Sequence, residues 1–318
     1  MALSQAVRWQ EAALDVLRAT GGDIHERRVH QTWGDRVVIE ARTSRFPTGV
    51  VLKASREQSV PAEVYAVQCA ERAGVPVPAI LAEGTDQRLP GQDWFVMRRA
   101  AGQPWAAVAQ ADAQRARTLD DLGHVFASLH GVPMCNYGPL TPGLGGQDAS
   151  WSGWLHAELL SCAQPLIRAG YLPPHFMCLA DDVLRSLAPE LETVRPRLLH
   201  GDLGDGEIFV DARSGAVTAL VDWGDVLSGD PLYDFARFVA GGPADDERPA
   251  LYLPRVMQSY TRYVGYDPAA LEGKVFALYD MHNAVRNAAW CVREETAWIE
   301  DLCARAMSIV AKLSTAPQ

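Results

Sequence analysis

Three acidic residues have the types and the spacing that phosphoryl transfer requires. Asp202 lies in LLHGDLGDGEIFV (198–210), Glu207 follows five positions later, and Asp222 lies in VDWGDVLSGDPLYDFA (221–236). Phosphoryl transfer needs one carboxylate that faces the acceptor hydroxyl, and oxygen ligands that hold Mg²⁺ between the phosphates. We therefore predict that Asp202 orients or deprotonates an acceptor and that Glu207 and Asp222 hold Mg²⁺.

The residues between these carboxylates predict how the chain brings them together. Residues 207–223 contain two apolar runs joined by ARSG, with Gly215 in the turn, which is typical of a β-hairpin. Such a hairpin would return the chain from Glu207 to Asp222. A single HGD or DWG triplet could be an ordinary turn, but two carboxylate triplets flanking a hairpin are hard to obtain by chance.

These stretches resemble the catalytic loop and the metal-binding triplet of the protein-kinase-like superfamily. HGD at 200–202, the triplet DWG at 222–224 and GDPLYDFA at 229–236 are most similar to the aminoglycoside phosphotransferase family. A protein kinase would need Ala-Pro-Glu after this triplet, and Ala-Pro-Glu occurs only at 188–190.

The resemblance implies an α+β, protein-kinase-like bilobal fold. A small N-terminal antiparallel sheet lobe would bind the nucleotide, and a larger, mainly helical C-terminal lobe would carry catalysis and substrate binding. The implied activity is transfer of the γ-phosphate of ATP or GTP, with Mg²⁺, to a hydroxyl of an aminoglycoside or similar antibiotic. A metabolite kinase acting on choline, an amino alcohol or a sugar is the first alternative.

The resemblance also implies roles around the catalytic loop. His200 and Asp230 would orient the loop, and Asp230 and Asp234 would bond loop backbone and cap the next helix. One residue departs from the family pattern, because Glu207 stands where the family usually has Asn. Glu is a good Mg²⁺ ligand, so the site could remain active, or the chain could be a nucleotide-binding pseudokinase.

Nucleotide contacts are expected in the first hundred residues. Lys53 ends the apolar run VVLK, and Glu63 follows ten positions later. In kinase-like folds such a pair fixes the α- and β-phosphates. The backbone near Met97 would bind the nucleotide base. The loop 31–36, whose only glycine is Gly34, would cover the phosphates. Nothing in these residues separates ATP from GTP.

Acceptor contacts are expected from Asp225 and from the acidic, aromatic stretch 280–302. This stretch contains Trp290, Glu294 and Glu295, which could bind a cationic amino sugar or polyamine. The alternative is an exposed helix face with tryptophans in the core. The acceptor is thus predicted to be a small, possibly cationic molecule.

The remaining sequence predicts the elements that position these residues. We expect helices at 4–19, 63–73, 110–130, 150–169, 177–189 and in several segments of 246–315, and strands at 36–41, 49–55 and 94–99, besides the hairpin. The prolines of VPVPAIL exclude a helix after residue 74. The sequence pattern changes from mixed strands and helices to mainly helices near residue 100, which predicts two domains, 1–100 and 101–318.

Composition limits the classes of partner. The chain has 318 residues, 48% of them hydrophobic, and a formal net charge of −10, which argues against nucleic-acid binding. No apolar run approaches a membrane span, and the N-terminus lacks the apolar region of a secretory signal. Six scattered cysteines predict buried free thiols in a reducing compartment, so we expect a cytoplasmic protein; the oligomeric state stays open.

Overall fold

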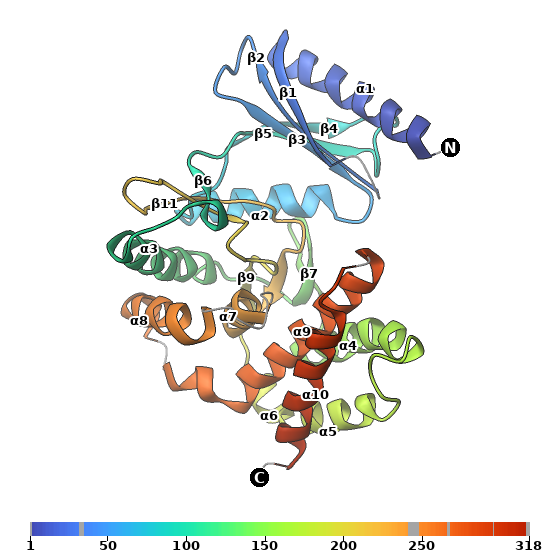
Figure 1. The fold of residues 1–318 in the computed structure, drawn as a ribbon, viewed down its shortest axis with the longest axis vertical. Coiled ribbons are helices and arrows are strands. Elements are labelled where there is room, and N and C mark those ends of the chain that lie inside the picture. Colours follow the sequence, from blue (N-terminus) through green and yellow to red (C-terminus); the bar gives the residue numbers. More distant parts are fainter. Residues whose placement is uncertain (1, 32–34, 241–247, 266–267, 295, 316–318) are drawn as a thin grey trace. The chain divides into compact units, whose positions relative to one another are not determined.

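The computed structural model describes residues 2–31, 35–240, 248–265, 268–294 and 296–315 (Figure 1). The chain forms two compact units. The first contains residues 1–110, 141–143 and 205–226, and the second contains 111–140, 144–204 and 227–318. The hairpin region thus groups with the N-terminal residues. The division into a nucleotide-binding lobe, 1–100, and a catalytic and substrate-binding lobe, 101–318, is a functional division and stays a prediction.

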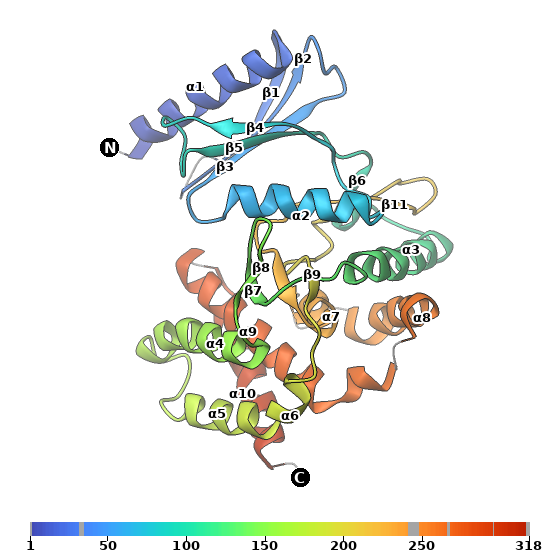
Figure 2. The same cartoon turned by 180° about the vertical axis from the view of Figure 1, so that it is seen from behind.

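The first unit is built on a five-stranded antiparallel sheet between two helices (Figures 1 and 2). Its strand order is β1-β2-β3-β5-β4. The elements are α1 (Ala2–Gly21), β1 (Ile24–Gln31), β2 (Arg36–Thr43), β3 (Val50–Ser55), α2 (Val60–Arg72), β4 (Ile80–Thr85) and β5 (Asp93–Arg98). The predicted helices and strands are present. Strand β1 is an additional strand that its polar sequence did not indicate, and β4 begins within the stretch for which the prolines excluded a helix.

Alternation along the strands divides the side chains of this sheet between its two helices. Leu52 and Val96 pack with α1 in one apolar cluster, whereas Phe95 packs with Val60 and Val64 of α2. Successive side chains of a strand point to opposite faces. Lys53, which pairs with Phe95 in register, therefore lies on the face that α2 covers.

A second, three-stranded sheet completes the first unit. It has the order β11-β10-β6, formed by β6 (Gln103–Pro104), β10 (Ile208–Val210) and β11 (Val217–Leu220), with the short helix η1 at Trp105–Ala107. Strands β10 and β11 are the predicted hairpin, and Gly215 has a φ of 73° in its turn. A positive φ favours glycine because glycine has no Cβ.

The second unit is mainly helical, as predicted. Its helices are α3 (Asp112–His130), α4 (Trp151–Arg168), α5 (Phe176–Ser186), α6 (Ala188–Leu191), α7 (Pro231–Ala240), α8 (Leu253–Val264), α9 (Lys274–Glu294) and α10 (Ile299–Thr315), with short helical segments η2 (Arg248–Tyr252) and η3 (Pro268–Glu272). Helix α9 packs against α4, α7 and α10. Trp151, Trp154, Tyr233 and Tyr279 form a buried aromatic cluster among these helices.

A small four-stranded sheet in the second unit was not predicted. It has the order β8-β7-β12-β9, formed by β7 (Tyr137–Thr141), β8 (Gly145–Asp148), β9 (Arg197–Leu199) and β12 (Leu227–Gly229). Strands β9 and β12 are three residues each and pair antiparallel, Leu199 with Leu227. They directly precede the HGD triplet and Asp230, so this pairing brings the two motifs of the sequence to one place.

The cysteine prediction holds only in part. All six cysteines are free, and Cys69, Cys291 and Cys303 are buried as expected, but Cys135 and Cys178 are exposed. A thiol can stay reduced without burial, so exposure does not require a disulfide. Within the described part of the chain, no helix is both long and apolar enough to cross a membrane.

His282 makes the stability of the second unit depend on pH. Its ring is fully buried, with Nε2 3.1 Å from the Leu155 carbonyl oxygen and Nδ1 2.9 Å from the Tyr233 hydroxyl. Burial, and then the nearby Arg286 cation, lower the pKa of His282 to about 3. Because its unfolded pKa is about 6.5, the unfolded chain binds more protons between these values. The stabilisation is present above pH 6.5 and is lost as pH falls.

We expect the free energy of unfolding to fall by about 1.4 kcal/mol for each pH unit below 6.5, because the imidazole of His282 binds a proton only in the unfolded chain in this range. Urea unfolding between pH 7.5 and 5 measures this slope, and His282→Gln should flatten it. His156→Gln is the matched control, since His156 is half exposed beside Asp181. Equal slopes for wild type and His282→Gln would contradict the assignment.

Candidate active site

Lys53, Glu63 and Asp222 meet in the first unit. The Lys53 Nζ lies 2.8 Å from Glu63 Oε2 and 2.7 Å from Asp222 Oδ1. Lys53 and Glu63 are almost fully buried, while the Asp222 side chain is 49% exposed. The backbone N–H of Trp223 also donates to the Glu63 carboxylate. The expected Lys–Glu pair is thus placed together with one predicted metal ligand.

The electrostatics of this cluster keep Lys53 charged. Burial alone would lower the pKa of Lys53, but the adjacent Glu63 and Asp222 carboxylates outweigh burial, so its pKa lies above the ordinary value. Burial raises the pKa of Glu63, and Lys53 opposes that rise. The result is a fixed ammonium group that can bind phosphate oxygens.

Asp222 and Glu207 stand at the open end of the β10–β11 hairpin. Ile208 pairs with Leu220, and the Val221 N–H donates to the Glu207 carbonyl oxygen at 3.0 Å. Asp222 has a φ of 59°, in the left-handed region that side chains rarely adopt. Such backbone strain is concentrated at functional sites, and here it sets the direction of a carboxylate.

These two carboxylates fit a Mg²⁺ site. Mg²⁺ is usually bound through one or two carboxylates, substrate phosphates and water rather than by an all-protein cage. The described residues contain no group of three or more His, Cys, Asp or Glu side chains that could hold a metal. Asp222 is half exposed and Glu207 partly exposed, so both can reach an incoming ion.

The structure places Met97 within the five-stranded sheet, and its contact with the base stays a prediction. Met97 lies inside β5, paired with Val51 on one side and with Ile80 on the other. The next two N–H groups are also used, Arg98 to Ala79 at 2.9 Å and Arg99 to Gly49 at 3.0 Å. Part of the expected phosphate-covering loop, residues 32–34 with Gly34, lies outside the described residues.

The second unit holds the loop that carries Asp202. The Asp234 carboxylate accepts the N–H groups of His200 and Gly201, each at 2.8 Å, and lies 3.2 Å from His130 Nε2. Asp234, His130 and His200 are all buried. The loop is therefore anchored by Asp234, the residue for which the sequence predicted a backbone contact.

Asp230 fixes the start of α7 instead of the loop. Its Oδ1 accepts the Leu232 N–H at 3.0 Å, and its Oδ2 accepts the Tyr279 hydroxyl at 2.8 Å. Burial raises the pKa of Asp230, and these two donors oppose the rise. The loop-orienting role predicted for Asp230 is thus indirect, because it holds the helix that carries Asp234.

Asp202 pairs with Arg237, which the sequence analysis did not identify. Arg237 Nε donates to Asp202 Oδ1 at 2.9 Å, and Arg237 Nη2 donates to the same oxygen. The side chains are 18% exposed for Arg237 and 31% exposed for Asp202. The available signal was helical spacing, since Arg237 lies three positions after Asp234 on α7.

The predicted acceptor residues are divided between the two units. Asp225 belongs to the first unit, whereas Trp290 and Glu294 are exposed, one turn apart near the end of α9. Glu295 lies outside the described residues. The exposed Trp290, 43% accessible, contradicts the alternative that it belongs to the core, so an exposed aromatic and acidic helix end remains as the candidate.

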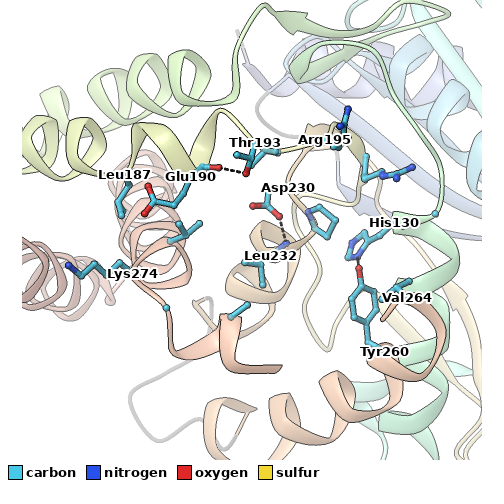
Figure 3. A pocket seen from close by; sticks show the side chains of 17 residues that line it. His130, Leu187, Glu190, Thr193, Arg195, Asp230, Leu232, Tyr260, Val264 and Lys274 are labelled. Atoms are coloured by element: carbon cyan, nitrogen blue, oxygen red, sulfur yellow. Dashed lines mark hydrogen bonds between the residues drawn. The ribbon is translucent and has the colours of Figure 1, made fainter. Parts of the chain in front are cut away.

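A cavity of about 810 Å³ lies in the second unit (Figure 3). His130, Asp230, Leu232 and Tyr260 line it, and Asp202 does not. The Asp230 carboxylate and the His130–Tyr260 pair point toward it in Figure 3. The cavity therefore adjoins the groups that support the loop and does not contain the carboxylate expected to act on an acceptor.

Comparison with known proteins gives one family. The model of a family described as the phosphotransferase enzyme family matches residues 17–272. The chain is also similar to a thermostable mutant of aminoglycoside phosphotransferase APH(4)-Ia in ternary complex with AMP-PNP and hygromycin B, with 18% identity, a TM-score of 0.71 and coverage of 96% of this chain and 99% of that chain. For the GDP complex of aminoglycoside 2′-phosphotransferase-IIIa, identity is 15%, the TM-score 0.60 and coverage 96% and 98%. These two structures share its fold.

Proposed function

Because this chain belongs to the phosphotransferase enzyme family, we propose that it transfers the γ-phosphoryl group of ATP or GTP to a hydroxyl of an aminoglycoside or similar antibiotic. The observation that carries the proposal is the setting of Asp202. The backbone before it is fixed by Asp234, its Oδ1 is held by Arg237, and its Oδ2 makes no hydrogen bond within the described residues. A carboxylate held in this way suits a general base.

In this proposal Asp202 accepts the proton of the acceptor hydroxyl while the hydroxyl oxygen bonds to phosphorus and the nucleoside diphosphate leaves. Lys53, held by Glu63, binds phosphate oxygens of the nucleotide. Glu207 and Asp222 would hold Mg²⁺, which supplies positive charge to the phosphates when bound. The cytoplasm is the proposed compartment, because it supplies MgATP and keeps six free thiols reduced.

The acceptor is proposed to be cationic. The chain carries a net charge of −10, and Glu294 lies one turn from the exposed Trp290. Carboxylates gathered near a binding surface concentrate cations, and an aromatic face adds a cation–π contact. A relative of the same fold was solved with hygromycin B and AMP-PNP, and another with GDP; the choice between ATP and GTP is left to experiment.

The test is ADP or GDP release by the full chain with MgATP or MgGTP against aminoglycosides, other hydroxylated antibiotics, amino alcohols and sugars. Release should rise above the acceptor-free rate with an aminoglycoside, and mass spectrometry should find a phosphorylated product. The KM of a cationic acceptor should rise with salt at saturating nucleotide. Product formation only from amino alcohols or sugars would identify a metabolite kinase, and nucleotide binding without any product would identify a pseudokinase.

Glu207→Asn is expected to keep transfer within about threefold of wild type, because Asn and Glu both offer an oxygen ligand to Mg²⁺. Asp222→Ala is the contrasting variant and should remove the Mg²⁺-dependent part of nucleotide affinity, measured by calorimetry with and without Mg²⁺. A folded but inactive Glu207→Asn would show that Glu207 is more than a replacement ligand.

A further inference from the structure

Helix α7 contacts three consecutive residues of the catalytic loop in order. Asp234 accepts the N–H groups of His200 and Gly201 at 2.8 Å each. Arg237 lies three positions later, on the same helix face, and donates to the side chain of the next loop residue, Asp202. The same helix thus fixes both the backbone of the loop and the carboxylate at its end.

The Asp202–Arg237 pair differs from an ordinary surface ion pair in how it uses the carboxylate. In the exposed pair of Arg255 with Asp120, Nε donates to Oδ1 at 3.0 Å and Nη2 to Oδ2 at 2.6 Å, so both oxygens are occupied. Arg237 instead donates twice to Oδ1 of Asp202. Within the part of the chain that the structure describes, Asp202 Oδ2 has no hydrogen bond.

From this geometry we infer that Arg237 is a positioning residue for Asp202: it fixes the carboxylate through Oδ1 and so presents Oδ2 to the acceptor hydroxyl. The inference rests on the proposed function. The terminal torsion of Asp is broad when nothing holds it, and a general base acts within hydrogen-bond reach of the proton that it takes. A planar guanidinium with two donors to one oxygen restricts that torsion, which a single ammonium contact does less well.

Arg237→Met is expected to lower kcat about 100-fold, since a misplaced catalytic group can cost that factor. The KM for nucleotide should not change, because the substitution leaves the proposed nucleotide contacts Lys53, Glu63 and Asp222 intact. Arg237→Lys should recover part of kcat. Arg255→Met is the matched control, which removes an Arg–Asp pair of the same unit and should leave kcat unchanged. A kcat for Arg237→Met equal to wild type would overturn the inference.

A double-mutant cycle tests whether Arg237 acts through Asp202. In the Asp202→Asn background, Arg237→Met should lower single-turnover transfer less than threefold. A further loss of about 100-fold there would mean that Arg237 acts on the phosphoryl group or the acceptor directly, and the inference would be wrong.

Thermal unfolding of the same four proteins gives a readout that needs no acceptor. The two substitutions should shift the unfolding midpoint non-additively, because they remove one shared contact. If the wild type phosphorylates no acceptor, the proposed function fails, and with it the presentation of Oδ2 to an acceptor. The midpoints then test only whether Arg237 holds the Asp202 carboxylate: additive shifts would refute that contact, and non-additive shifts would support it.

Discussion

Replacing Asp202 by Asn is expected to lower phosphoryl transfer about 10²–10⁴-fold, the usual contribution of a general base. Asn keeps the shape of the side chain, but its amide cannot take the hydroxyl proton. Nucleotide affinity should stay unchanged, because the substitution leaves Lys53 and its partners Glu63 and Asp222 intact. Single-turnover transfer from radiolabelled ATP or GTP measures the first effect, and calorimetry with a non-hydrolysable analogue measures the second.

The matched control is Asp182→Asn, which changes an exposed Asp of α5 that pairs with Arg185. It should transfer phosphate at the wild-type rate. Turnover near wild type in Asp202→Asn would refute the assignment of the base. Loss of nucleotide binding in the same variant would instead indicate that the substitution disturbs more than the acceptor side.

Replacing Lys53 by Met is expected to lower the free energy of unfolding by about 3–5 kcal/mol, the range found when one partner of a buried ion pair is removed. Glu63 is 2% exposed, so it would be left as a buried carboxylate without its Lys53 partner, although the Trp223 N–H would remain. Nucleotide affinity should also be lost, because no cation would remain at this place on β3. Urea unfolding and nucleotide titration measure the two effects.

The double variant Lys53→Met with Glu63→Gln separates these effects. It removes both buried charges, so most of the stability should return while nucleotide affinity stays lost. Lys312→Met, on the exposed side of α10, controls for loss of a lysine and should change neither quantity. If Lys53→Met unfolds like wild type, the pair does not hold the helix α2 to the sheet.

The sequence alone identified the family and the fold class. The HGD and DWG triplets and GDPLYDFA lie within 37 residues of one another, and their chemistry depends on a local loop and a hairpin with a glycine turn. The family match and the antiparallel sheet followed by helices confirm both predictions. Lys53 was also predictable, because strand alternation fixes its face and α2 follows directly.

Only the tertiary structure decided which charged groups meet. Lys53 and Asp222 are 169 positions apart, and nothing near either residue specifies the other. Strands β9 and β12 are too short to show a pattern, and they exist because each supplies the other's backbone partners. Arg237 is the single Arg in the largely apolar sequence of α7, and from sequence alone such an Arg would be predicted to lie on the surface. Its place against Asp202 follows from the packing of α7 beside β9, which local sequence does not encode.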